Sequence, residues 1–148
     1  MATINQCERL VEHGDHWVVP LQGKTVTRCL VDHAFGMELW ERDGTTTIRI
    51  EGDFVLKGYG GEHLLSPASP TALGPALSTF GQVIAAVRAY KDGCLEVHFA
   101  DGSMLSVKPD AAYEAWEIAG TGGLRVVCPP GGSLSIWQPK GVVVSGPA

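Results

Sequence analysis

The chain has 148 residues, of which 45% are hydrophobic and 18% are charged, and its formal net charge at pH 7 is −5. This composition is typical of one globular domain and excludes a disordered polypeptide. Lys and Arg are scattered singly, so the chain lacks the basic face that a nucleic acid would require. No apolar run approaches the roughly 18 residues that span a bilayer.

The cysteines and the N-terminal sequence suggest a reducing compartment. Cys7, Cys29, Cys94 and Cys128 never occur with the CxxC spacing of a zinc or redox motif. We therefore expect reduced and mostly buried thiols. The first residues lack a basic stretch followed by an apolar one, so we expect no signal peptide and a cytoplasmic location.

The chain is expected to begin with a short helix. Apolar residues in the segment 3–13 recur with a helical period, and Thr3 and Gln6 have the spacing of a capping box. Gly14 is placed to end this helix. The apolar residues 17–19 are expected to form a short edge segment.

Two Asp-Gly turns, one in each half of the chain, are the most informative feature of the sequence. Asp43-Gly44 and Asp101-Gly102 are each flanked by alternating apolar and polar residues, which is the strongest short-range signal for a β-hairpin. The offset between the two turns also pairs Gly23 with Gly81. We infer two copies of one β-meander.

The repeat is expected to slip by one position after the turns. Leu105 then corresponds to Ile48 and Val107 to Ile50, so that the offset between the copies becomes one shorter than it is before the turns. A β-bulge in one copy would account for the change.

Further strands and turns follow the same logic. The segment 58–70 is rich in turn-forming residues, and a short helix is expected at 71–79 with Ser69 as its cap and Pro70 as its first residue. The expected strands are 25–32, 36–41, 46–51 and 54–57 in the first copy, 82–90, 94–99 and 103–108 in the second, and 114–119, 124–128 and 133–137 in a third meander.

This pattern predicts a mainly β fold of nine to eleven short antiparallel strands with one or two short helices, arranged as a sandwich or a partly closed barrel. The two copies are related by an approximate two-fold axis or form neighbouring meanders of one curved sheet. We expect a single domain, 1–148, with these parts: lead-in 1–20, first meander 21–57, linker 58–80, second and third meanders 81–137, and a loose tail 138–148 whose run 142–144 can pair with a sheet edge.

The densest group of polar and aromatic residues is the candidate binding site. It comprises Asp110, Tyr113, Glu114, Trp116 and Glu117. Paired carboxylates could perform acid–base chemistry if a pocket raised one pKa. They could equally bind a basic partner around an aromatic anchor. The structural alternative places Trp116 in the core, Asp110 as a turn cap and the glutamates in solvent.

Other groups of polar residues are weaker candidates for a functional site. His13 and His16 have HxxH spacing, but Gly14 interrupts the expected helix and no third ligand is near. Glu62-His63 is expected to be a solvated pair. Asp32 and His33 point to opposite faces of a strand.

The sequence also lacks the expected partners for nucleophilic catalysis. Cys94 and His98 would be about 13 Å apart along a strand, which is too far for a thiolate–imidazole pair. No nucleophile-elbow or phosphate-binding motif is present. We therefore expect no metal and no cofactor, and we favour a protein that is not an enzyme.

The segment 101–137 resembles a family of small uncharacterised proteins common in actinobacteria. The shared signature is DGxxLxV…DxxYEAWE…PGGxLxxW, carried here by Asp101, Gly102, Leu105, Val107, Asp110, Tyr113 to Glu117, Pro130 to Gly132, Leu134 and Trp137. The resemblance extends over roughly residues 21–137. It implies no established activity. Immunity proteins that neutralise toxins are comparable small β-rich proteins of these bacteria, by analogy of class.

Three functions follow as hypotheses. The first is a protein-binding module, such as an immunity-type inhibitor of a basic partner, because the chain is acidic and lacks catalytic motifs. The second is a small enzyme or ligand carrier whose pocket is lined by Asp110, Glu114 and Glu117. The third is a self-associating structural protein, with Trp40, Trp137 and the run 142–144 as the dimer face.

Overall fold

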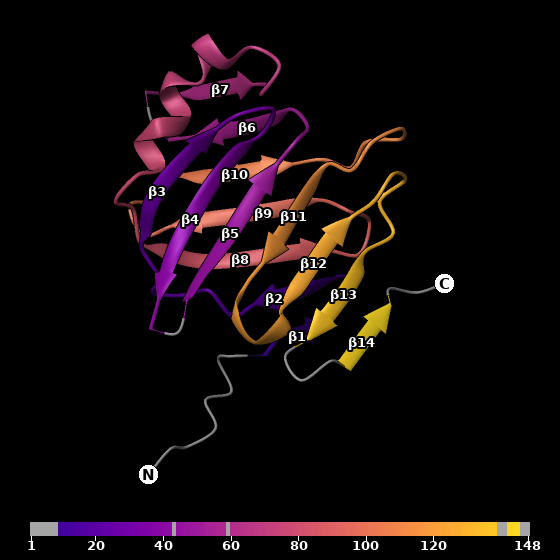
Figure 1. Ribbon diagram of the computed structural model, residues 1–148. Coiled ribbons are helices and arrows are strands. Elements are labelled where there is room, and N and C mark those ends of the chain that lie inside the picture. Colours follow the sequence, from indigo (N-terminus) through magenta and orange to yellow (C-terminus); the bar gives the residue numbers. More distant parts are fainter. Residues whose placement is uncertain (1–8, 43, 59, 139–141, 146–148) are drawn as a thin grey trace.

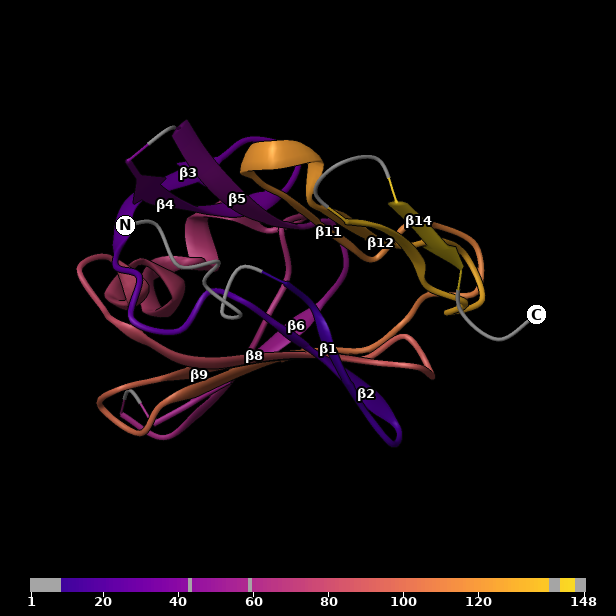
Figure 2. The ribbon, with the colours of Figure 1, turned by 90° about the horizontal axis from the view of Figure 1, so that it is seen from below.

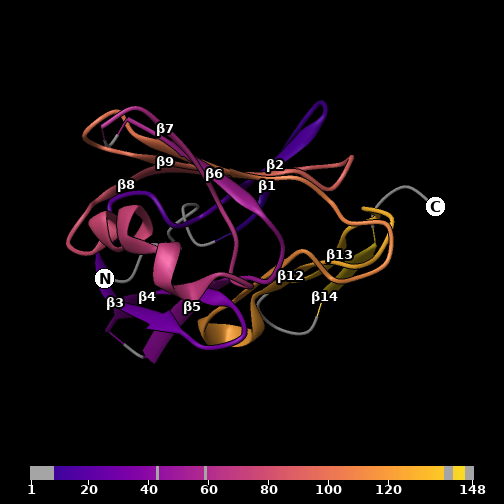
Figure 3. The ribbon, with the colours of Figure 1, turned by 90° about the horizontal axis from the view of Figure 1, so that it is seen from above.

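The computed structural model describes residues 9–42, 44–58, 60–138 and 142–145. It contains two seven-stranded antiparallel sheets that face one another, as the views along the sandwich show (Figures 2 and 3). The strands of one sheet cross those of the other at a steep angle (Figure 1). The expected mainly β sandwich is confirmed.

Sheet I contains the first meander up to Ile50 and the third meander, whereas the expected strand 54–57 of the first copy lies in the other sheet. Its order is β3 (Val26–Val31), β4 (Phe35–Glu41), β5 (Gly44–Ile50), β11 (Trp116–Ala119), β12 (Arg125–Cys128), β13 (Ser135–Gln138) and β14 (Val142–Ser145).

Sheet II contains the second meander. Its order is β1 (Val11–His13), β2 (His16–Val19), β8 (Ile84–Tyr90), β9 (Leu95–Phe99), β10 (Met104–Val107), β6 (Phe54–Lys57) and β7 (Glu62–Leu65).

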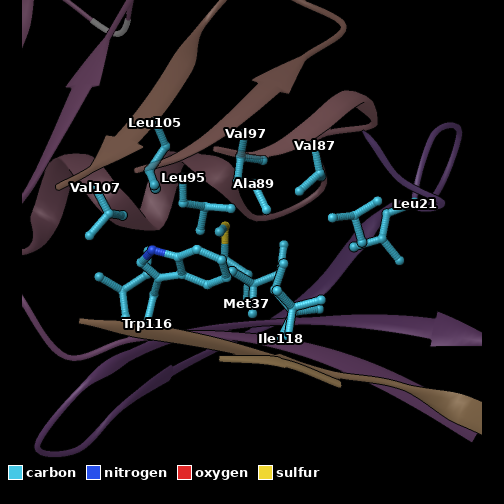
Figure 4. Close-up of a cluster of buried hydrophobic side chains, with 14 of the residues drawn as sticks. Leu21, Met37, Val87, Ala89, Leu95, Val97, Leu105, Val107, Trp116 and Ile118 are labelled. Atoms are coloured by element: carbon cyan, nitrogen blue, oxygen red, sulfur yellow. The ribbon is translucent and has the colours of Figure 1, made fainter. Parts of the chain in front are cut away.

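The core fills the space between the inner faces of the sheets. Alternate residues of each strand are buried, as the pattern of β9 shows for Leu95, Val97 and Phe99. Figure 4 shows side chains of both sheets meeting in this layer. The rings of Phe35 in sheet I and Phe54 in sheet II stack with their centroids 5.6 Å apart. Such alternation is what a half-buried strand requires.

The two meanders occupy opposite sheets and exchange their following strands. Strands β3, β4 and β5 are neighbours in sheet I, and β8, β9 and β10 are neighbours in sheet II. The chain then crosses over: β6 leaves sheet I to pair with β10, and β11 leaves sheet II to pair with β5. This reciprocal exchange is the arrangement that a two-fold axis would generate, and it excludes one continuous curved sheet.

Both copies also carry the same irregularity. The register between β3 and β4 shifts between Val26 and Arg28, and the register between β8 and β9 shifts between Ile84 and Ala86. These positions are separated by the same offset as Gly23 and Gly81. The bulges therefore belong to the repeated unit.

The copies meet at one corner of the sandwich, where β3 and β8 begin. Thr25 and Val83, which are equivalent positions of the repeat, form an antiparallel bridge there. Around it, four backbone hydrogen bonds form two reciprocal pairs: Gly23 N–H to Ile84 C=O (2.8 Å) and Gly81 N–H to Val26 C=O (2.8 Å), then Val26 N–H to Gln82 C=O (2.9 Å) and Ile84 N–H to Lys24 C=O (2.8 Å). The sheets are thus joined by backbone as well as by core packing.

The change in offset between the two copies after the Asp-Gly turns was predicted in the wrong direction. Met37 faces Ile48 in sheet I, and Leu95 faces Val107 in sheet II. Since Met37 and Leu95 are equivalent positions, Val107 corresponds to Ile48 and not to Ile50. The offset between the copies therefore becomes one longer past the turns, where the sequence had suggested one shorter.

The length of the two hairpin loops explains the slip. Glu41 faces Gly44, so β5 starts at Gly44 after a two-residue loop, of which Asp43 lies outside the described residues. In the second hairpin, the Phe99 N–H donates to the Ser103 carbonyl around a three-residue loop. Gly102 has φ 92° in that loop, a left-handed conformation that favours glycine.

The prediction of an N-terminal helix is wrong for those of its residues that the structure describes. Val11–His13 form strand β1, which pairs with β2 through a turn at Gly14, whose φ is 56°. Glycine in this conformation turns a hairpin as readily as it ends a helix. Residues 1–8 of the expected helix lie outside the described residues.

The linker is more ordered than its composition suggested. It contains strand β7, and the expected helix at 71–79 is replaced by two 3₁₀ segments, η2 (Pro70–Ala72) and η3 (Gly74–Thr79). Pro70 begins the first, but the Ser69 side chain makes no capping hydrogen bond. Both segments lie at one end of the sandwich, between the edges of the sheets (Figure 2).

The C-terminal strands agree with expectation. Strands β11, β12 and β13 form the third meander, and a further 3₁₀ turn, η4 (Thr121–Gly123), joins the first two. The run 142–144 pairs with the sheet as part of β14. No helix in the described residues is long and apolar enough to cross a membrane.

From the symmetry of the corner we predict that equivalent substitutions in the two copies lower stability equally. Gly23 and Gly81 have φ values of 84° and 82°, and a Cβ at either position would meet no atom within 4 Å. We expect Gly23→Ala and Gly81→Ala each to lower the free energy of unfolding by about 1–2 kcal/mol, the cost of a left-handed non-glycine residue. Urea denaturation measures both.

Gly74→Ala is the control. Its Cβ also enters open space, but Gly74 does not have a positive φ. We expect no loss of stability there. A loss at only one of the two corner glycines would contradict the equivalence of the copies.

Candidate functional site

The structure separates Trp116 from the other predicted site residues. Its side chain is fully buried, with 0% exposure, and lies between the two sheets (Figure 4). The indole Nε1–H donates to the Gly93 carbonyl at 2.8 Å. Trp116 is therefore a core residue, as the structural alternative had it, and cannot contact a partner directly.

Of the remaining predicted residues, Asp110, Tyr113 and Glu114 lie in the loop 108–115 between β10 and β11, and Glu117 lies on β11. Asp110 caps this loop: its carboxylate accepts hydrogen bonds from the backbone N–H groups of Ala112 (2.7 Å) and Tyr113 (3.0 Å). The Gly131 N–H donates to the Asp110 carbonyl at 2.9 Å. The loop holds Tyr113 outward with 74% of its surface exposed.

This loop is also where the second copy departs from the first. Three residues, 51–53, connect β5 to β6, whereas eight residues, 108–115, connect β10 to β11. The two connections are equivalent in the strand order. The extra length therefore provides a surface that the first copy lacks.

The two glutamates at the end of the loop have different environments. Glu117 lies on the outer face of sheet I and accepts a hydrogen bond from the Arg125 Nε–H at 2.6 Å. Arg125 also lies over the Trp137 ring, 5.5 Å from its centroid. Partial burial and then the charges of Glu117 and Glu51 raise the pKa of Glu114.

Sequence reasoning missed a second polar group, on the outer face of sheet II. We call it the outer network: Arg88 and Tyr90 of β8, and Glu96 and His98 of β9. The Tyr90 hydroxyl donates to Glu96 Oε1 at 3.0 Å, and His98 Nε2 lies 2.9 Å from the same oxygen. Arg88 Nη1 lies 3.3 Å from His98 Nε2 and 4.0 Å from Glu96 Oε1.

Glu96 is the centre of this network. Burial, the largest single influence, favours its protonated form, but hydrogen bonds from His98 and Tyr90 and the charges of His98 and Arg88 outweigh it and lower the pKa of Glu96. Arg88 and Tyr90 could not be recognised as partners of Glu96 and His98 from the sequence, because these side chains meet only through the pairing of β8 with β9.

A shallow, open hollow adjoins the outer network at the β1–β2 hairpin. Its volume is about 430 Å³, and it is lined by His13, Asp15, His16, Val18, Arg88 and Tyr90. The rings of His13 and His16 stack with centroids 5.8 Å apart. The His16 and Tyr90 rings are 5.2 Å apart. None of the predicted carboxylates lines this hollow.

The cysteine environments do not favour nucleophilic chemistry. Burial, followed by the hydrogen bond and charge of Asp92, raises the pKa of Cys94 to about 11. Burial also raises the pKa of Cys128 to about 11. Cys29, the third described free thiol, lies 3.6 Å from the Thr79 hydroxyl, and burial raises its pKa. These thiols are protonated near neutral pH.

The described part of the chain holds no group of three or more His, Cys, Asp or Glu side chains placed to bind a metal ion. Asp32 lies in the turn between β3 and β4, where its carboxylate accepts the Ala34 N–H at 2.7 Å and pairs with Arg49 of β5 at 3.2 Å.

Comparison with known proteins identifies the family. Residues 17–138 match a family of unknown function, DUF6188. The match covers most of the chain, so the chain belongs to this family. No curated protein and no solved structure matches it. The expected membership in an uncharacterised family is confirmed, while the signature motif and the bacterial group stay predictions.

The pKa of Glu96 predicts how stability depends on pH. A carboxyl group whose pKa is lowered by folding stabilises the fold above its unfolded pKa and loses that effect as pH falls through the folded value. We expect wild-type stability to fall below about pH 5 and the fall to be smaller in Glu96→Gln. At pH 7 this variant should lose about 1–2 kcal/mol of unfolding free energy.

Tyr90→Phe serves as the graded comparison. It removes one of the two hydrogen bonds to Glu96 Oε1 and keeps the ring. Its pH dependence should fall between those of wild type and Glu96→Gln in denaturation series run from pH 7 to pH 3. Identical profiles for wild type and Glu96→Gln would contradict the role given to Glu96.

Proposed function

We propose that this member of the DUF6188 family is a non-enzymatic protein-binding module that engages a basic partner through the loop 108–115. The observation that carries the proposal is Tyr113, a large aromatic side chain held outward by a hydrogen-bonded loop beside carboxylates. Exposed tyrosines of this kind are frequent anchors of protein interfaces.

The loop is organised before any partner binds. At its far end the Ala115 N–H donates to the Cys128 carbonyl at 3.1 Å, and the Ala115 carbonyl accepts from Glu51 (2.9 Å) and Gly52 (3.1 Å). Asp110 closes its centre through two backbone N–H groups. Since ordering a loop costs free energy on binding, this arrangement favours affinity.

The charges beside the loop favour a cationic partner. The carboxylates of Glu114, Glu117 and Glu51 interact, and their mutual repulsion contributes to the raised pKa of Glu114. Arg125 pairs with Glu117 and offsets part of this charge. A Lys or Arg of a partner placed near Glu114 would relieve the rest, and the net charge of −5 would speed the encounter.

The two alternative functions have less support. A ligand carrier with a carboxylate pocket would need Asp110, Glu114 and Glu117 around one hollow, and the hollow at β1–β2 is lined by other residues. For self-association, Trp40 is 65% exposed, but Trp137 contacts Arg125 within its own chain. An immunity-type inhibitor, which covers a basic surface of a toxin, agrees with the proposal.

The proposal predicts which substitutions weaken binding. A partner is first recovered from the native host with the full chain as bait, purified and titrated by calorimetry. We expect one partner per chain and a loss of affinity of about 30-fold for Tyr113→Ala, because a central aromatic anchor contributes roughly 2 kcal/mol. Glu114→Gln should weaken binding less, and added salt should reduce its effect.

Trp40→Ala is the matched control, because it removes another exposed aromatic residue, at the opposite end of sheet I. It should bind as wild type does. Each variant must keep wild-type thermal stability, as exposed sites usually allow. A partner whose affinity falls with Trp40→Ala and not with Tyr113→Ala would contradict the proposed surface.

A further inference from the structure

The HxxH segment forms a hairpin, and the hairpin brings its two histidines together. His13 ends β1 and His16 begins β2, and the two residues are cross-strand partners. Both side chains lie on the outer face of sheet II, with ring planes 20° apart. Gly14, which would interrupt a helix at this position, forms the turn that places the two histidines opposite each other.

Asp15 sets the orientation of one ring. Its Oδ1 lies 2.9 Å from His16 Nδ1. A carboxylate only accepts hydrogen bonds, so Nδ1 carries the proton and Nε2 keeps a free lone pair when the ring is neutral. Histidines that bind metal ions are oriented by a carboxylate in this way.

The separation of the rings fits one shared ion. A zinc–nitrogen bond is about 2.0–2.1 Å, so two imidazoles that bind one ion have centroids at most about 6.4 Å apart. The observed separation of 5.8 Å lies within that limit. Because the rings stack nearly parallel and the lone pair of an imidazole nitrogen lies in the ring plane, at least one ring must turn out of the stack to point a nitrogen toward a common centre.

We propose that His13 and His16 bind a divalent late transition-metal ion, such as Ni²⁺ or Zn²⁺, at the hollow of the β1–β2 hairpin. The hollow provides the space that water ligands would need to complete the coordination. Imidazole is a preferred ligand of these ions. The positive charge of Arg88, which also lines the hollow, is offset by Glu96, whose Oε1 lies 4.0 Å from Arg88 Nη1.

Calorimetric titration of the full-length, tag-free chain with NiCl₂ at pH 7.5 tests this site. We expect one ion per chain and at least a tenfold loss of affinity in both His13→Ala and His16→Ala. Asp15→Ala should weaken binding by about tenfold, because it removes only the group that orients His16. The metal-free variants are checked by thermal melting to show that they are folded.

His33→Ala is the matched control, because His33 is an exposed histidine that also follows an aspartate. It should bind Ni²⁺ as wild type does. The proposal is overturned if wild type binds Ni²⁺ no more tightly than the His13→Ala/His16→Ala double variant, or if His33→Ala loses as much affinity as His16→Ala. Wild-type affinity in Asp15→Ala would also contradict it.

Discussion

The reciprocal hydrogen bonds at the β3–β8 corner are the constraint on which the rest of the fold depends. They join the two sheets by backbone at the Thr25–Val83 bridge. With the meanders fixed there, one in each sheet, each following strand pairs with the open edge of the opposite meander. The exchange of β6 and β11 provides hydrogen-bond partners for the open edges of β10 and β5. In an isolated three-stranded meander these edge groups would stay unpaired.

The same near-symmetry indicates where specific function can reside. Equivalent positions of the two copies have the same structural role, as the bulges at Val26 and Ile84 show. Features found in only one half are not needed for this repeated architecture. Two of them are the long connection 108–115 with its exposed Tyr113, and the β1–β2 hairpin that extends sheet II beyond β8. The proposed partner surface and the proposed metal site lie on these two additions, and neither needs the other.

Much of the fold could be predicted from local patterns. The alternation in 94–99 and the Asp-Gly turns identified β9 and both hairpins, because strand period and turn chemistry are local properties. The direction of the slip could not be predicted, since it depends on whether a loop has two or three residues. The site was harder: Arg88, Tyr90, Glu96 and His98 meet only through the pairing of β8 with β9, and the burial of Trp116 depends on the opposite sheet.

Native-state hydrogen exchange, followed residue by residue by NMR, tests the central role of the corner most directly. The four amides that donate its reciprocal bonds belong to Gly23, Val26, Gly81 and Ile84. If the corner joins the halves into one cooperative unit, all four exchange only through global unfolding, with one common free energy equal to that from denaturation. Exchange of one pair by local opening, at a clearly lower free energy than the other, would contradict the account.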